Sequence, residues 1–262
     1  MNSKLLSGAI IISLLSVIAI IAPLLTKHNP AAITVEEALL APSLTHLLGT
    51  DQLGRDLFSR MIYGARVSLL VGVISVGIAT LIGLFLGSLA GFFGGAPEGL
   101  IMRFTDIMLC FPAFFLILSA AAILEPSIFN IMLIIGLTNW MPAARLVRAE
   151  ILSLKEREFI LAAKAMGVSN FRIIIRHLIP NALEPIIVNA TLGIAGAILL
   201  ESSLSFLGLG VQPPSPSWGN ILAESKSTLG VAWWLALFPG LSILLTVLGF
   251  NLLGEGLREH KE

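Results

Sequence analysis

The amino-acid sequence predicts an all-α integral membrane protein that crosses the bilayer as six helices. The chain is 56% hydrophobic and only 12% charged, and its mean hydropathy of +0.94 lies far above that of soluble domains. Its apolar segments run for about 20 residues, the length that a helix needs to cross a hydrocarbon core roughly 30 Å thick. They are continuous rather than alternating, which favours helices over barrel strands.

The first apolar segment, residues 5–25, follows Lys4 and therefore starts like a secretory signal. Signal cores are shorter, about 7 to 15 residues, and no small-residue cleavage site precedes Pro23. We therefore expect a retained transmembrane helix within residues 1–26, then an external segment with a short helix over residues 27–66. Five further spans are predicted within residues 67–262, at about 67–93, 100–124, 127–146, 185–206 and 231–253.

The distribution of basic residues predicts that both termini are cytoplasmic. With a cytoplasmic N-terminus, 11 of the 16 Lys and Arg residues fall inside and 5 outside, which follows the positive-inside rule. Trp218, Trp233 and Trp234 then fall near the outer boundary, where we expect them to anchor the chain in the membrane interface. Gly83 and Gly87 form a GxxxG pair that we expect to pack within the chain.

The cytoplasmic connection, residues 147–184, is too long to be a simple turn. We expect a helix over residues 156–166 that ends where Gly167 adopts the left-handed conformation, then a second helix capped by Ser169 and closed by Pro180. The second helix has an apolar face and a basic face, formed respectively by Phe171, Ile174, Ile175 and Leu178 and by Arg172 and Arg176. Its shape suits docking into another protein, and its charges suit a helix lying on anionic lipid equally well.

The same connection resembles the EAA loop of binding-protein-dependent ABC importer permeases. The residues that carry the resemblance are Ala162, Ala163, Gly167, Ile173, His177 and Pro180. The glutamate of that motif would fall at Leu161, so the chain departs from the pattern there, and Glu158 one helical turn earlier is the candidate to replace it. The resemblance implies a loop that sits in a cleft of an ATP-binding subunit and couples ATP hydrolysis to transport.

Three further segments narrow the resemblance to the dipeptide, oligopeptide and nickel permease group and to its second, C-type subunit. Their sequences are HLLGTDQLGRDLFSRMIYGARVSL, LESSLSFLGLGVQPPSPSWGNIL and FNLLGEGLREH, and they extend the match over residues 44–260. The resemblance implies a type I (MetI-like) importer permease fold in the cell inner (plasma) membrane. It also implies three kinds of partner: a homologous second permease subunit, two ATP-binding subunits and an extracytoplasmic substrate-binding protein. The implied cargo is a short peptide, and nickel or a nickel chelate is the alternative.

The residues themselves give no sign of catalysis. No G-x-x-x-x-G-K-[ST] run is present, so we expect no cofactor in this chain and expect ATP and magnesium on partner subunits. No span pairs a nucleophile with a histidine, so we expect no enzyme and no catalytic residues. A self-sufficient secondary carrier is less favoured, since internal repeats and several midplane charges are missing. The net charge of zero gives no reason to expect a nucleic-acid partner.

The external segment offers a candidate docking surface at Asp51, Arg55 and Asp56. The simpler interpretation is a helix capped by Thr50 or Asp51, with a surface ion pair between Asp56 and Arg60.

No spacing among His28, His46, Asp51 and Asp56 is typical of a metal site, so we expect isolated surface histidines and no metal.

Two acidic residues fall within predicted spans, Asp106 in the third and Glu201 near the outer end of the fifth. Buried charge is costly in lipid, so each has a partner or a function. We expect pairing between helices or subunits, with a lining of the translocation path as the alternative. Arg145 and Arg148 close the fourth span and can extend to the membrane surface.

Overall fold

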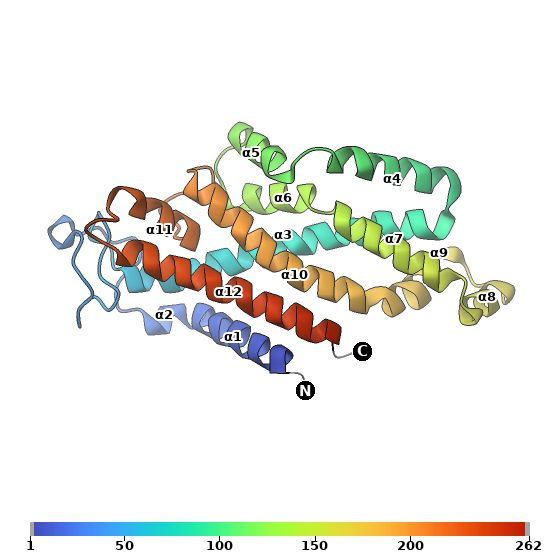
Figure 1. The fold of residues 1–262 in the computed structure, drawn as a ribbon, viewed down its shortest axis with the longest axis horizontal. Coiled ribbons are helices and arrows are strands. Elements are labelled where there is room, and N and C mark those ends of the chain that lie inside the picture. The colour runs from blue at the N-terminus through green and yellow to red at the C-terminus, as the bar shows by residue number, and fades with distance from the viewer. Residues whose placement is uncertain (1–2, 260–262) are drawn as a thin grey trace.

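In the computed structural model, which describes residues 3–259, the chain forms an elongated bundle of helices (Figure 1). The described residues contain no β-strand, only an isolated bridge between Thr50 and Asp56. The predicted all-α class is thus confirmed. The α-helices are α1 (Ser3–Ile20), α2 (Ala22–Leu25), α3 (Leu57–Phe93), α4 (Gly95–Leu109), α5 (Ala113–Ile123), α6 (Ile128–Thr138), α7 (Met141–Lys155), α8 (Glu158–Ala165), α9 (Asn170–Ile173), α10 (Ile179–Phe206), α11 (Trp218–Glu224) and α12 (Trp234–Glu259). Short 3₁₀ turns lie at Val35–Glu37 and Ser225–Ser227.

Four helical stretches are long and apolar enough to cross a membrane: α1, α3, the continuous stretch Asn170–Phe206, and α12. A fifth crossing requires α4 and α5 to be counted together, although they are bent by 82°. The shorter apolar helix α6 does not reach spanning length by itself. The predicted number of six spans is therefore not confirmed by the lengths of the helices.

Both broken spans are interrupted next to proline. In the predicted span 100–124, the helix stops before Pro112, which has no backbone N–H and disfavours helical geometry at Phe111. In the predicted span 127–146, α6 ends at Thr138 and α7 begins at Met141 with Pro142 in its first turn. Asn139 lies in this break, where its side-chain amide donates to the carbonyl of Ile135 over 2.8 Å.

The segments between the spans differ from the predicted bounds. Helix α3 begins at Leu57 rather than near residue 67, and α10 continues through Pro185, where the fifth span was predicted to begin. The prediction that Pro180 closes the second loop helix is wrong, because Pro180 lies in the first turn of α10. The π-helical turn Ile174–Leu178 precedes it, and this wider turn lets the helix continue into the proline. The non-helical part of the 147–184 connection is correspondingly short.

Close helix packing depends on small residues. Cβ atoms added to Gly83 and Gly87 would lie 2.5 Å and 2.6 Å from atoms of Ala143 and Ala144 in α7, so the GxxxG pair packs within the chain as predicted. Helices α1 and α12 lie side by side (Figure 1), and Gly8 is in contact with the α12 backbone at Gly249.

The prediction of three interfacial tryptophans is wrong for two of them. Trp218 and Trp234 are 1% and 4% exposed, whereas Trp233 is 52% exposed. The indole N–H groups of Trp218 and Trp234 donate to the carbonyls of Met61 and Thr50, each over 3.1 Å. These indoles bury apolar area while their polar atoms stay bonded, so they hold segments of the chain together rather than anchoring it in the membrane interface.

Candidate functional site

Residues 156–178 form a projection at one end of the bundle, here called the α8–α9 tip (Figure 1). Its attachment is apolar: Ile160, Ala163 and Ile173 are at most 3% exposed. Together with Leu178 of the π turn, they form one core cluster with Val147 and Ile151 of α7 and Ala182 and Ile186 of α10. The tip is therefore fixed to α7 and α10 by hydrophobic burial and moves with them.

Gly167 ends α8 in the left-handed conformation, as predicted, with φ of +76°. The amide of Gly167 donates to the carbonyl of Lys164 over 3.0 Å, and the amide of Val168 donates to the carbonyl of Ala163 over 3.1 Å. These two bonds make a Schellman motif, which reverses the chain within one turn. Ser169 precedes α9, but its side chain makes no capping hydrogen bond.

The outer face of the tip carries unusually exposed apolar side chains. Met166 and Phe171 are 76% and 75% exposed, and Phe159 and Leu161 are close to half exposed. Of the predicted apolar face, Phe171 and Ile175 are exposed, whereas Leu178 is buried in the core together with Ile173. An apolar protruding surface with basic neighbours is typical of an interaction site.

The remaining predicted coupling residues lie on or beside this projection. Glu158 and Ala162 are exposed on α8, and Leu161 presents an apolar side chain at the position where the family has glutamate. His177 is half-buried in the π turn and Pro180 is exposed at the start of α10. The residues predicted from the sequence therefore lie close together in the structure. Ala163 and Ile173 hold the tip in place, His177 is half-buried, and the others are exposed.

The opposite end of the bundle contains a buried charged network, here called the Asp51 cluster (Asp51, Arg55, Arg60 and Glu224). The Asp51 carboxylate accepts from Arg55 Nε over 2.6 Å and also pairs with Arg60. Arg60 and Arg55 both donate to Glu224 on α11, at 2.5 to 3.0 Å. Asp51 is fully buried, and Arg55 and Arg60 are 7% and 2% exposed. The network thus ties the external segment to α11.

Asp56 plays a different part from the predicted one. It is the N-cap of α3, where its Oδ2 accepts from the amide of Ser59 over 2.8 Å. Its Oδ1 lies 2.9 Å from Nδ1 of His46. The predicted surface ion pair with Arg60 and the helix cap at Thr50 or Asp51 are therefore wrong. The prediction of isolated surface histidines is wrong for His46, which is 4% exposed and lies against the exposed ring of His28.

The two acidic residues predicted within spans have contrasting surroundings. Glu201 is fully buried and accepts from the hydroxyl of Ser205 over 2.7 Å. Asp106 on α4 is largely exposed and pairs with Arg145 on α7, with Nη2 and Oδ1 2.5 Å apart. Arg148 pairs with Glu98 in the same way. Arg145 and Arg148 thus bind acidic groups on α4 as well as lying near the end of the apolar zone.

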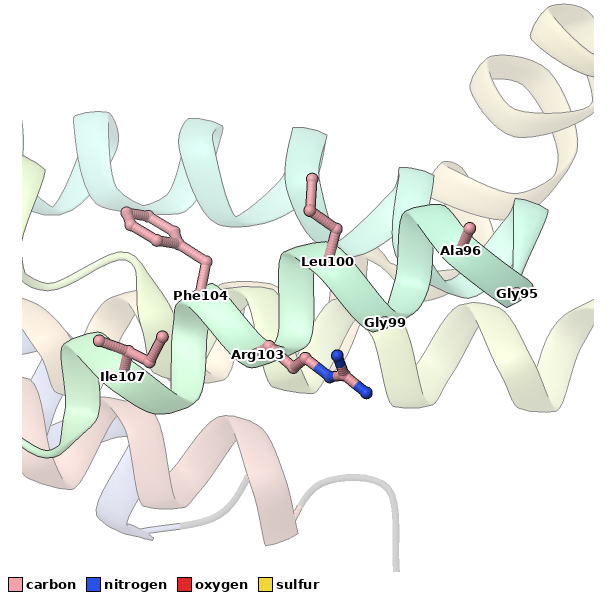
Figure 2. A pocket seen from close by; sticks show the side chains of 7 residues that line it. All are labelled: Gly95, Ala96, Gly99, Leu100, Arg103, Phe104 and Ile107. Atoms are coloured by element: carbon pink, nitrogen blue, oxygen red, sulfur yellow. The ribbon is translucent and has the colours of Figure 1, made fainter.

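One face of α4 is uncovered in the single chain. A shallow hollow of about 790 Å³ lies along it. Figure 2 shows that the lining residues all come from this one helix: Gly95, Ala96, Gly99, Leu100, Arg103, Phe104 and Ile107. Leu100, Phe104 and Ile107 are 52% to 75% exposed. The hollow is therefore a helix face open to its surroundings rather than an enclosed pocket.

Comparison with known proteins identifies the family. The sequence model described as "Binding-protein-dependent transport system inner membrane component" matches residues 83–260. The chain belongs to this family. It is 48% identical to a dipeptide transport system permease protein of Alkalihalophilus pseudofirmus, over 98% of this chain and 85% of the relative. It is 43% identical to a probable D,D-dipeptide transport system permease protein of Escherichia coli, over 97% and 85% of the two chains.

A solved structure supports the fold. An inward-facing structure of the MetNI methionine ABC transporter aligns with a TM-score of 0.58 over 78% of this chain and 97% of that chain, at 17% identity. The resemblance found from the sequence motifs is thus confirmed, and the chain is a transmembrane permease component of a binding-protein-dependent transport system.

Glu224 is an interacting residue that the sequence motifs did not reveal, and its partner Arg60 was expected to pair with Asp56 instead. Their side chains meet although 164 positions separate them in the chain. Glu224 lies in no spacing that would identify it, and only the placement of α11 beside the start of α3 brings the two residues together.

Proposed function

We propose that this permease carries short peptides and that separate ATP-binding subunits drive it through the α8–α9 tip. The observation that supports the coupling role is the shape of the tip, whose buried side holds it to α7 and α10 while its apolar outer side is free to bind. A force applied to such a tip is transmitted to two long helices. The names of the relatives favour a peptide cargo over nickel.

The full assembly that we propose contains a second, homologous permease subunit, two ATP-binding subunits that carry ATP and magnesium, and an extracytoplasmic substrate-binding protein. The uncovered face of α4 supports a membrane partner, because the exposed Asp106–Arg145 pair beside it is costly against lipid and is better placed against protein or a polar path. Asp51, Arg55 and Asp56 are largely buried, so a binding protein would contact the surface that they shape rather than their charges.

The topology belongs to the same proposal. We place both termini and the 147–184 connection in the cytoplasm, with six crossings in the inner membrane. The third crossing would consist of the bent α4–α5 pair. The fourth would consist of α6 and part of α7, which are joined at the Asn139 break. The positive-inside bias supports this orientation, since 11 of 16 basic residues then lie on the cytoplasmic side.

Substitution of Gly167 tests the coupling role. A Cβ atom at this position would meet no heavy atom within 4 Å, so a substitution acts only through the backbone conformation. Gly167→Val disfavours the left-handed turn by about 1–2 kcal/mol, whereas Gly167→Asn tolerates it. In the complete transporter reconstituted in liposomes, we expect Gly167→Val to reduce peptide uptake per ATP hydrolysed at least severalfold and Gly167→Asn to stay close to the unmodified chain.

Membrane insertion and copurification of the partners serve as controls for both variants. Equal peptide uptake per ATP in Gly167→Val and the unmodified chain would contradict a coupling role for the tip. Ion-driven transport by the purified chain alone would contradict the need for ATP-binding subunits and favour a secondary carrier.

A further inference from the structure

His28, His46 and Asp56 come together at the end of the bundle opposite the α8–α9 tip. One potential ligand atom from each of the three lies within 4.8 Å of the other two. His28 follows α2, His46 lies in the loop before α3, and Asp56 caps α3. Bonds of about 2.0–2.2 Å to a first-row metal ion require ligand atoms roughly 3–4 Å apart. A small movement of the exposed His28 would bring the three into that range.

The surroundings of the cluster hold two of the three side chains in place. His46 and Asp56 are 4% and 5% exposed. Oδ2 of Asp56 accepts from the amide and the hydroxyl of Ser59, at 2.8 Å and 2.7 Å, which leaves Oδ1 facing His46. Two groups that are already fixed lose little freedom when they bind an ion, so only His28 would have to become ordered.

Glu37 supplies the outer partner that a metal-binding histidine usually has. Its Oε2 lies 3.5 Å from Nε2 of His46, the ring nitrogen remote from Asp56. A carboxylate that accepts the proton of the far nitrogen leaves the near nitrogen free to bind an ion.

An opening leads to the cluster. A cavity of about 140 Å³ adjoins it and is lined by Leu25, Lys27, His28, Leu44, Thr45, Leu47, Asp56 and Phe58. The space is large enough for the water molecules that complete the coordination of an ion held by three protein ligands. Lys27 is exposed, so its ammonium can extend into solvent away from a bound cation.

We propose that His28, His46 and Asp56 bind one divalent transition-metal ion, with Zn²⁺ as the representative species. Two imidazoles and a carboxylate suit zinc and its neighbours better than magnesium or calcium, which prefer oxygen ligands alone. The ion would join the segment after α2 and the loop around His46 to the first turn of α3. This proposal is independent of the cargo and of the ATP-binding partners.

The test uses the full chain, purified in detergent with an affinity tag that contains no histidine and treated with a chelator. Isothermal titration with Zn²⁺ should show one ion bound per chain at micromolar or lower concentration, and Co²⁺ should give the visible absorption of a nitrogen- and oxygen-ligated site. His28→Ala should weaken Zn²⁺ binding at least tenfold, and Glu37→Gln, which replaces a partly exposed side chain, should weaken it by roughly 10- to 100-fold. His177→Ala, which removes the half-buried histidine of the π turn, should leave the affinity unchanged.

Because His28 and Glu37 lie at the surface, replacing them does not endanger folding, and thermal unfolding without metal checks this for each variant. The proposal would be overturned if the chain bound no Zn²⁺ at a concentration about 100-fold above micromolar. Equal Zn²⁺ affinity of His28→Ala and the unmodified chain would also overturn it. The cluster would then be a hydrogen-bonded His46–Asp56 pair with a neighbouring surface histidine.

Discussion

The two ends of the bundle differ in which kind of side chain they bury and which kind they expose. At the Asp51 cluster, polar and charged groups are buried and bonded to one another, and they join segments distant in sequence. At the α8–α9 tip, apolar groups are exposed and few side-chain hydrogen bonds are made among the described residues. The charged groups of the first end are paired within the chain, whereas the second end offers an apolar surface that a partner can bury.

The difference indicates where stability and function can be separated. A buried ion pair that loses one partner leaves an unpaired charge, so changes at the Asp51 cluster should mainly destabilise the fold. Removing an exposed apolar side chain leaves the fold nearly unchanged, so changes at the tip should mainly affect binding.

The largest effect is expected from Arg60→Ala. It would leave the buried carboxylate of Asp51 and the partly buried carboxylate of Glu224 with only Arg55 as a cationic partner among the described residues, at a cost of about 3–5 kcal/mol. Thermal unfolding of the purified chain in detergent, followed by tryptophan fluorescence, measures the change. Arg66→Ala is the matched control, since Arg66 is exposed on the same helix and should change stability by only about 0.5 kcal/mol or less. Equal losses in both variants would mean that the cluster does not brace this end.

A smaller but clear loss of stability is expected from Gly54→Ala, which tests the left-handed backbone turn at the same end of the bundle. Gly54 has φ of +71°, and a Cβ atom there would lie 1.8 Å from the carbonyl oxygen of Thr34. The left-handed backbone alone costs about 1–3 kcal/mol for a residue other than glycine, and the clash adds to it.

Gly77→Ala is the control for this substitution, because Gly77 is exposed within α3 and a Cβ atom there meets nothing within 4 Å. Alanine should stabilise the helix at this position by up to about 1 kcal/mol. Unfolding midpoints that move in the same direction for both variants would show that the turn at Gly54 is not required.

The smallest effect on stability is expected at the tip. Phe171→Ser removes a side chain that is 75% exposed, so the free energy of unfolding should change by only about 0.5 kcal/mol or less. Binding of the purified ATP-binding subunits should nevertheless weaken at least tenfold, or about 1.4 kcal/mol, because exposed aromatic side chains often carry interface energy. Val35→Ser, at a 66% exposed position of the opposite end, should leave that binding unchanged. If Phe171→Ser lowered the stability of the chain without weakening the binding of the ATP-binding subunits, the tip would serve the fold rather than partner binding.

Local sequence signals predicted the tip well and the opposite end poorly. Gly167 after an alanine-rich helix is a local pattern, and the structure contains the left-handed turn that it predicts. Arg60 and Glu224 meet only because α11 folds back beside α3, and no local spacing records this. The same holds for His28 and His46, whose rings lie 5.1 Å apart across a loop of irregular structure.

The structure departs from the prediction at two prolines. Pro180 was expected to end a helix, but a π turn precedes it and the helix continues, with Ile173 and Leu178, just before and at the end of that turn, buried against residues of α7. Pro112 breaks the third predicted span, which apolarity alone suggested to be continuous. Hydrophobicity thus located the long apolar segments, but it did not show where the helices within them are interrupted.

Site-specific photocrosslinking tests the central claim most directly. A photoreactive amino acid is placed at position 171 on the tip, or at position 35 on the opposite end, of the transporter assembled in native membranes. We expect position 171 to crosslink to an ATP-binding subunit, with a yield that changes when ATP is added, and position 35 to give no such product. Crosslinks from position 171 to lipid alone would contradict the account and show that the tip lies on the membrane surface.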